Sequence, residues 1–184
     1  MLNSRCSTAL ADYDFSPTPV VAPSRLNRSG SSPDSALAAL LAPADVLLDL
    51  DVPTKRRALE EIARFVAERN GLPCGEVHAN LVERETIGST AVGFGMAIPH
   101  ARLKGLPRPI AAFVRTKFPI PFDAPDDKPV SEMLVLLVPQ QATDEHLRLL
   151  AAVAEMFGDK VFRERLRSCA QPADVHSALT RWPV

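Results

Sequence analysis

Hydrophobic residues recur at three- and four-residue intervals over residues 54–70, and this spacing predicts the clearest helix of the chain. Thr54 can accept a hydrogen bond from the first turn, and Gly71 follows the last turn as a residue suited to ending a helix. The apolar face of this predicted helix consists of Leu59, Ile62, Ala63 and Val66. Such a face indicates a helix that packs against a core.

Several other stretches favour helix. Residues 75–85 follow Pro73 and place Val77, Leu81 and Val82 on one side, so Arg84 would lie near the end of a helix. A stretch rich in alanine and leucine predicts a short helix that Pro43 would end. The predicted helices besides 54–70 cover residues 35–41, 75–85, 143–157, 160–167 and 172–180.

Apolar runs between the helices predict strands over residues 46–50, 91–98, 110–115 and 133–138. The run 133–138 is apolar throughout, which indicates a strand buried on both faces. Residues 119–129 predict a turn-rich connection. The alternation of strands and helices predicts an α/β domain with a mixed central sheet covered by helices on both faces.

Composition limits the possible classes of protein. Residues 1–34 are rich in Ser, Pro and Asn, so we expect a disordered N-terminal tail followed by one domain over residues 35–184. The net charge of -1 implies no general attraction to nucleic acid. We expect no membrane-spanning segment and no secretory signal, because no apolar run is long enough and the N-terminus lacks the signal pattern. Three widely spaced cysteines indicate a cytoplasmic protein without a metal site.

The segment 84–100 contains most of the residues that could bind a ligand or take part in a reaction. Arginine binds phosphate through a fork of donors, and hydroxyls and exposed backbone N–H groups line anion sites. Histidine is a nucleophile near neutral pH. The residues concerned are Arg84, Ser89, Thr90, Gly93, Gly95 and His100. The combination predicts a site at which a phosphoryl group is placed on His100 or removed from it.

The same segment resembles the enzyme IIA domain of the fructose/mannitol type in the bacterial phosphotransferase system, and most closely its nitrogen-regulatory branch. The resemblance spans residues 41–182, with Ala101 standing where the family often has glycine. The stretches that carry it are Arg84-Glu85, Ser89-Thr90, Gly93-x-Gly95-x-Ala97-Ile98-Pro99-His100, Phe122-Asp123-Ala124, Leu137-Val138-Pro139 and His146-Leu147.

The resemblance implies that His100 carries the phosphoryl group, on Nε2, and that His146 lies beside it as a donor to the phosphoryl oxygens. It also implies a fructose/mannitol-type enzyme IIA fold. Arg84 would bind the phosphoryl group or hold the loop that bears Ser89. From the residues alone, His146 could instead be a helix-surface histidine, and Arg84 could form a surface salt bridge with Glu85 or Asp144.

Four further residues, Ser89, Thr90, Gly93 and Gly95, are expected to form a loop around the phosphate. The two glycines could equally be tight positions within a strand. We expect partner proteins to dock around His100, on a surface that includes Arg102, Lys104, Phe94 and Met96.

The function that the resemblance implies is that of a phosphocarrier rather than a turnover enzyme, with an HPr-like donor and no organic cofactor or metal. Because the chain shows no transporter segment and no cysteine motif of a IIB domain, we expect regulation of target proteins, such as kinases or potassium-transport proteins. One alternative is a sugar-specific IIA component that passes phosphate to a separate IIB protein. Another is a binding module in which His100 carries no phosphate.

Overall fold

The computed structural model describes residues 33–141 and 144–182. The predicted N-terminal tail falls almost wholly outside these residues and stays a prediction. The helices are α1 (Pro33–Leu40), η1 (Pro43–Asp45, a short 3-10 helix), α2 (Lys55–Asn70), α3 (Cys74–Ile87), α4 (Asp144–Gly158), α5 (Lys160–Ser168) and α6 (Pro172–Thr180). The strands are β1 (Val46–Leu50), β2 (Ala91–Gly93), β3 (Met96–Ala97), β4 (His100–Leu103), β5 (Ile110–Ile120) and β6 (Val130–Pro139).

The strands form one mixed six-stranded sheet in the order β1-β5-β6-β3-β2. β1 runs parallel to β5, whereas β5 and β6 are antiparallel. Both β3 and β4 pair in parallel with β6, one after the other, so they lie in line along the same side of β6 and act as one interrupted strand. His100 is the first residue of β4 and pairs with Leu136 of β6.

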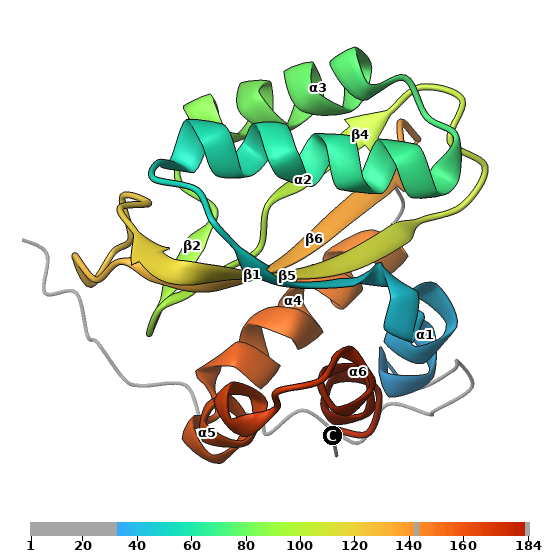
Figure 1. Cartoon of the computed structure of the whole chain (residues 1–184). Helices are drawn as coiled ribbons and strands as arrows, with labels where there is room; N and C mark the ends of the chain where they lie inside the picture. Colours follow the sequence, from blue (N-terminus) through green and yellow to red (C-terminus); the bar gives the residue numbers. More distant parts are fainter. Residues whose placement is uncertain (1–32, 142–143, 183–184) are drawn as a thin grey trace, which may run out of the picture.

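Helices cover both faces of the sheet (Figure 1): α2 and α3 lie on one face, and α1, α4, α5 and α6 lie on the other. Successive residues of β6 serve the two cores in turn, because side chains alternate across a strand. Val135 packs into the core under α2 and α3, and Leu134 and Leu136 pack into the opposite core. The predicted α/β class, with a mixed sheet covered on both faces, is confirmed.

Local signals explain the helix α2. The Thr54 hydroxyl accepts a hydrogen bond from the backbone N–H of Arg57, at 3.3 Å. Gly71 ends the helix with a φ of 64°, in the left-handed region that glycine adopts without steric cost. The predicted cap and helix end are therefore confirmed. The predicted start of the helix α4 at residue 143 lies outside the described residues.

The prediction of a single strand over residues 91–98 is wrong, because this stretch folds into the tight antiparallel hairpin β2–β3. Gly93, Phe94 and Gly95 have φ values of 87°, 57° and 80°. Three successive left-handed residues reverse the chain and cannot continue an extended strand. The glycines therefore mark a hairpin turn, as such pairs often do.

The strands β5 and β6 are longer than their apolar runs predicted. The segment expected to be a turn-rich connection begins within β5, and Ile120 still pairs with Val130. A register shift between Arg115 and Ile120 separates this extension from the central part of the sheet. In this extension Thr116 and Lys117 are polar and Pro119 breaks the apolar run, so the apolar pattern underestimated the length of the strand.

Candidate phosphoryl-acceptor site

The imidazole of His100 is half-buried and held through both of its nitrogens. Its Nδ1 lies 2.8 Å from the carbonyl oxygen of Ile98. The Nε–H of Arg84 donates to its Nε2 at 3.0 Å. A carbonyl oxygen can only accept, so Nδ1 carries the ring proton and Nε2 presents its lone pair. The contacts thus select a neutral tautomer in which Nε2 is the unprotonated nitrogen.

The surroundings of His100 also favour the neutral form. Burial lowers the pKa of this imidazole below its ordinary value, and the positive charge of Arg84 lowers it further. The hydrogen bond to Ile98 and the charge of Glu85 oppose this shift without reversing it. The imidazole therefore keeps its lone pair at neutral pH, as a nucleophile requires.

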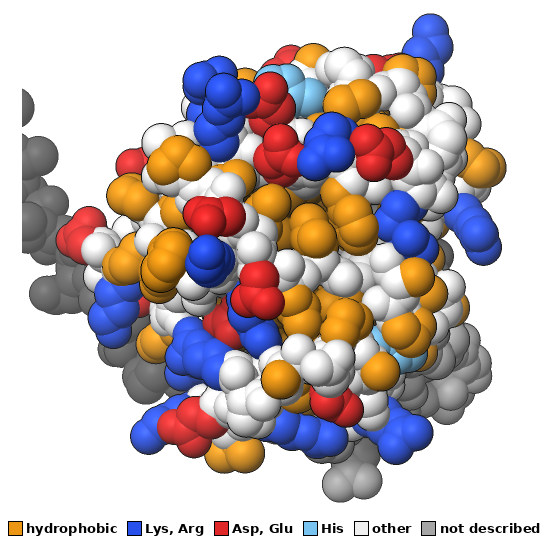
Figure 2. All heavy atoms as spheres, in the orientation of Figure 1, with side chains coloured by type: hydrophobic (Ala, Val, Ile, Leu, Met, Phe, Trp, Pro, Cys, Tyr) orange, Lys and Arg blue, Asp and Glu red, His pale blue; other side chains and the backbone are white. Residues whose placement is uncertain are grey.

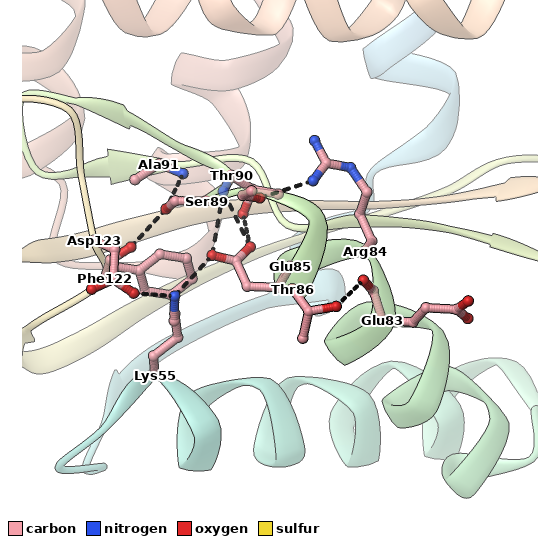
Figure 3. A network of polar contacts seen from close by, with 11 residues as sticks. Lys55, Glu83, Arg84, Glu85, Thr86, Ser89, Thr90, Ala91, Phe122 and Asp123 are labelled. Carbon is pink, nitrogen blue, oxygen red and sulfur yellow. Dashed lines mark hydrogen bonds and ion pairs between the residues drawn. The ribbon is translucent and has the colours of Figure 1, made fainter.

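Arg84 lies in the last turn of α3, where its guanidinium spans the helix end and the histidine. Its Nη1 donates to the carbonyl oxygen of Gly88 at 2.9 Å, while its Nε donates to His100. This contact with His100 stands in place of the alternative salt bridge with Glu85, whose carboxylate turns the other way (Figure 3). Arg84 thereby places its positive charge beside Nε2 of His100.

A buried carboxylate, Glu85, organises the loop that precedes the hairpin (Figure 3). It is only 7% exposed, and it accepts from the Thr90 hydroxyl at 2.6 Å and from the Thr90 backbone N–H at 3.1 Å. Lys55 donates to Glu85 at 3.2 Å and to Asp123 at 2.5 Å. Burial works against the charge of Lys55, but these two hydrogen bonds outweigh it and raise the pKa of the amine.

The loop held by Glu85 is connected to the histidine through the backbone. The carbonyl oxygen of Thr90 accepts from the N–H of Ile98 at 2.9 Å, and the carbonyl of Ile98 in turn holds His100. The Ser89 hydroxyl donates to the carbonyl of Phe122 at 2.7 Å. Ser89 and Thr90 thus hold the loop in the position that fixes the ring of His100, and their predicted contact with phosphate stays a prediction.

Sequence reasoning overlooked Glu85 and Lys55 as parts of the site. Both residues were visible, since Glu85 follows Arg84 directly and Asp123 lies in a stretch that carries the family resemblance. Their partners, however, lie 30 and 68 residues apart along the chain, in the pairs Lys55–Glu85 and Lys55–Asp123. The packing of α2 against α3 brings Lys55 to Glu85, and the segment between β5 and β6 brings Asp123 to Lys55.

The two glycines of the predicted phosphate loop lie in the turn of the β2–β3 hairpin. A Cβ on Gly95 would lie 3.1 Å from the guanidinium of Arg167, and one on Gly93 would lie 3.3 Å from the carboxylate of Asp126. Met96, the residue after Gly95, pairs with Glu132 of β6, whereas His100 pairs with Leu136. These two positions on β6 are four residues apart, which corresponds to about 13 Å along the strand. The structure therefore does not bring the glycines together with His100, and their predicted role gains no support from these contacts.

His146 is the third residue of α4 and is half-buried. The helix follows the C-terminal end of β6, and this end pairs with β4, which begins with His100. The first turn of α4 therefore starts at the same end of the sheet as β4 (Figure 1). The predicted donation from His146 to a phosphoryl group stays a prediction.

The expected docking surface around His100 needs two corrections. Phe94 lies at the tip of the β2–β3 hairpin, away from His100, and does not belong to this surface. Met96 is fully buried, because its side chain fills the core beneath α4, and it cannot contact a partner. Arg102 and Lys104 are exposed as expected. The exposed apolar residues near the site elements are instead Ile87, at the end of α3, and Leu147, in the first turn of α4.

Two further observations concern the part of the chain that the structure describes. No group of three or more His, Cys, Asp or Glu side chains there is arranged to hold a metal ion. None of its helices combines the length and the apolar character needed to cross a membrane.

The fold and the site define the class of the protein. A neutral histidine begins a strand of a mixed sheet that helices cover on both faces, and its unprotonated nitrogen accepts from an arginine. This arrangement is suited to receiving a phosphoryl group. The sequence profile of the phosphoenolpyruvate-dependent sugar phosphotransferase system, EIIA 2, matches residues 39–182. The chain belongs to this family and is a phosphocarrier of the phosphotransferase-system type.

Its relatives include proteins of the nitrogen-regulatory branch. The chain is 45% identical over 130 residues to the nitrogen regulatory protein of Pseudomonas aeruginosa, covering 70% of this chain and 84% of the relative. It is 37% identical over 144 residues to that of Bradyrhizobium diazoefficiens, covering 78% and 94%. The predicted resemblance to this branch is confirmed.

Solved structures agree with this assignment. The nitrogen regulatory protein IIA-Ntr of Neisseria meningitidis superposes with a TM-score of 0.75 at 39% identity, covering 78% of this chain and 99% of that one. The mannitol IIA of Escherichia coli superposes with a TM-score of 0.64 at 18% identity, covering 76% and 98%, and it shares the fold.

Proposed function

We propose that His100 accepts a phosphoryl group on Nε2 from a phosphorylated HPr-like donor. The observation that carries this proposal is the pair of contacts on the ring. The carbonyl of Ile98 holds the proton on Nδ1, and Nε2 faces Arg84 at 3.0 Å. The nucleophilic atom is thus selected before a donor arrives, which lowers the cost of orienting it.

The transfer itself is a displacement at phosphorus. The Nε2 lone pair of His100 forms the new bond, while the bond between phosphorus and the donor's histidine breaks and leaves its electron pair on the donor nitrogen. Arg84 yields Nε2 to the incoming phosphorus and turns its donors to the phosphoryl oxygens, which carry the charge. The carbonyl of Ile98 stabilises the positive charge that spreads to Nδ1–H.

We further propose that the phosphorylation state regulates partner proteins. A phosphoryl group adds about -1.5 to -2 charges at neutral pH. Exposed Arg102 and Lys104 and the apolar Ile87 and Leu147 surround the elements of the site, so a partner docked there would meet this change of charge. The names of the nitrogen regulatory relatives support a regulatory role. The proposal includes kinases or potassium-transport proteins as targets and a cytoplasmic location.

Phosphorylation with the purified upstream donors tests the proposal directly. The mass of the intact protein should rise by one phosphoryl group, and ¹⁵N NMR should place that group on Nε2 of His100. His100→Ala should accept no phosphate, while the control variant His176→Ala, on α6, should accept it at the normal rate. Phosphate found on Nδ1, or retained by His100→Ala, would contradict the assignment.

A second candidate function is that of a sugar-specific IIA component. The chain is 32% identical over 136 residues to the PTS system fructose-specific EIIA component of Haloferax volcanii, covering 72% of this chain and 88% of the relative. Rapid transfer of phosphate from His100 to a separate IIB protein would favour this function. A protein whose mass stays unchanged with active donors would instead be a binding module that carries no phosphate.

A further inference from the structure

The tip of the β2–β3 hairpin presents an aromatic side chain in a strained position. Phe94 has a φ of 57° and is 48% exposed. A bulky residue in this left-handed region costs about 1–3 kcal/mol and persists only where its surroundings impose it. Here the N–H of Phe94 donates to Asp126 at 2.8 Å, and its carbonyl accepts from the guanidinium of Arg167. These two contacts fix the backbone of Phe94 at the tip of the hairpin.

An open groove of about 450 Å³ lies beside this ring. Its apolar part consists of the Phe94 ring, Pro119 and Pro129, and its polar part includes Lys128 and Arg167. Arg163 supports the ring from within the protein, since its guanidinium lies 4.1 Å from the ring centroid while it donates to two backbone carbonyls at the end of α4. The groove thus presents a fixed aromatic surface beside cationic side chains.

The charge around the groove is positive. The charged residues that line it are Lys128, Arg163 and Arg167, and none of its lining residues is acidic. Asp126 and Glu132 form ion pairs with Lys128 and Arg167. Glu132 is only 1% exposed and lies between two of the arginines, so it faces inward rather than into the groove. In Figure 2, Lys and Arg side chains lie at the lower left, over α5 and the nearby end of the sheet, with Asp and Glu side chains among them.

We propose that this groove docks an acidic peptide segment of a partner protein, with an apolar side chain against Phe94 and carboxylates on Lys128 and Arg167. Charge complementarity favours an acidic occupant. The open shape favours a peptide over a small molecule, because small-molecule sites enclose most of their ligand. Exposed Phe118, next to Pro119 in β5, extends the apolar surface beyond the groove. A fixed aromatic residue is the kind of anchor on which such docking depends.

The groove lies apart from the phosphoryl-acceptor site. Ser131 lines the groove and is five residues before Leu136, the partner of His100 on β6, a separation of about 16 Å along the strand. The charge that phosphorylation adds to His100 is thus farther away than the Debye length of about 8 Å at physiological salt. A partner held in the groove stays bound in both phosphorylation states. This inference does not depend on the proposed function.

Titration of the full-length, ¹⁵N-labelled protein with a synthetic peptide tests the proposal. The probe is acetyl-Asp-Asp-Phe-Asp-Leu-Asp-amide, and the control peptide has lysine in place of every aspartate. We expect the acidic peptide to shift the amide signals of Phe94, Gly95 and Lys128, with an affinity that falls as salt is added. Shifts centred on His100, equal binding of the lysine peptide, or no binding at millimolar peptide would overturn the proposal.

Two variants assign the binding to the groove. Lys128→Glu should weaken peptide binding at least about tenfold, which corresponds to about 1.4 kcal/mol. Lys104→Glu makes the same change of charge on the exposed loop after β4 and should leave the affinity unchanged. Phe94→Gly removes the ring, relieves the strained φ and should also weaken binding. Equal effects of the two lysine variants would show that the peptide responds to net charge alone.

Two other occupants are distinguished by the same samples. If inorganic phosphate displaces the peptide at equal concentration, the groove is a small-anion site, and the proposal fails. If the protein forms dimers that Phe94→Gly dissociates, the groove is an interface between copies of this chain, and the proposal fails in that case too. Unchanged phosphorylation of His100 in Lys128→Glu is expected, because the two sites are separate.

Discussion

Replacing Glu85 with glutamine should destabilise the protein more than any other single change of charge near the site. The carboxylate accepts from the Thr90 hydroxyl and N–H and from Lys55, and it is 7% exposed. Glutamine keeps one acceptor oxygen but turns an NH₂ group toward donors. A hydrogen bond to a charged group contributes about 1.5–3 kcal/mol, and removing one partner of a buried pair costs about 3–5 kcal/mol. We expect a loss of about 2–4 kcal/mol.

The same substitution should slow phosphorylation, because the loop held by Glu85 positions the carbonyl of Ile98 that orients His100. A ring that is oriented only part of the time should accept phosphate about tenfold more slowly, while the donor protein binds with unchanged affinity. Thr90→Val removes the hydroxyl but keeps the N–H, so it should reproduce part of both effects.

Urea unfolding gives the change in stability, and single-turnover phosphorylation gives the rate. Glu83→Gln is the matched control, because Glu83 lies on the same helix, loses the same charge and is exposed. Its stability should stay within about 0.5 kcal/mol of the unmodified protein. If Glu85→Gln were no less stable than Glu83→Gln, the buried network would contribute nothing measurable and the reasoning would be refuted.

Three other predictions concern the site itself. Arg84→Lys should slow phosphorylation of His100 about tenfold or more, since an ammonium lacks the forked donors, and Arg84→Gln should raise the pKa of His100 in an NMR titration because the charge of Arg84 lowers it. The pKa of His100 is lower in the folded than in the unfolded protein, so its neutral imidazole stabilises the fold above pH 6.5, and this stabilisation is lost as the pH falls through the pKa of the folded protein. Urea unfolding at several pH values should show this loss, and an equal pH dependence in His100→Gln would contradict it. His146→Ala should slow phosphorylation by about tenfold to a hundredfold with donor affinity nearly unchanged, and an unchanged rate would make His146 a surface residue.

Most of the architecture could be predicted because its signals are local. The helix α2 has an apolar face, a threonine cap and a glycine end within a span of 18 residues, from Thr54 to Gly71. The hairpin at Gly93 and Gly95 was misread because strand and turn share the same small and apolar residues there. What decided between them was the left-handed backbone of Phe94, which depends on Asp126 and Arg167 far along the chain.

The sequence by itself determined the class of the domain and placed the proposed phosphoryl acceptor His100 and an arginine in one segment, because a motif of 17 residues, Arg84 to His100, holds them both. The family resemblance implied Nε2, and the tertiary structure shows what keeps that nitrogen unprotonated. This protonation state depends on a carbonyl two residues away and a guanidinium 16 residues away meeting opposite edges of one ring. The tertiary structure also decided that Lys55, Glu85 and Thr90 support the site, since charges from separate helices and loops become partners only when the chain is packed and water is excluded from around them.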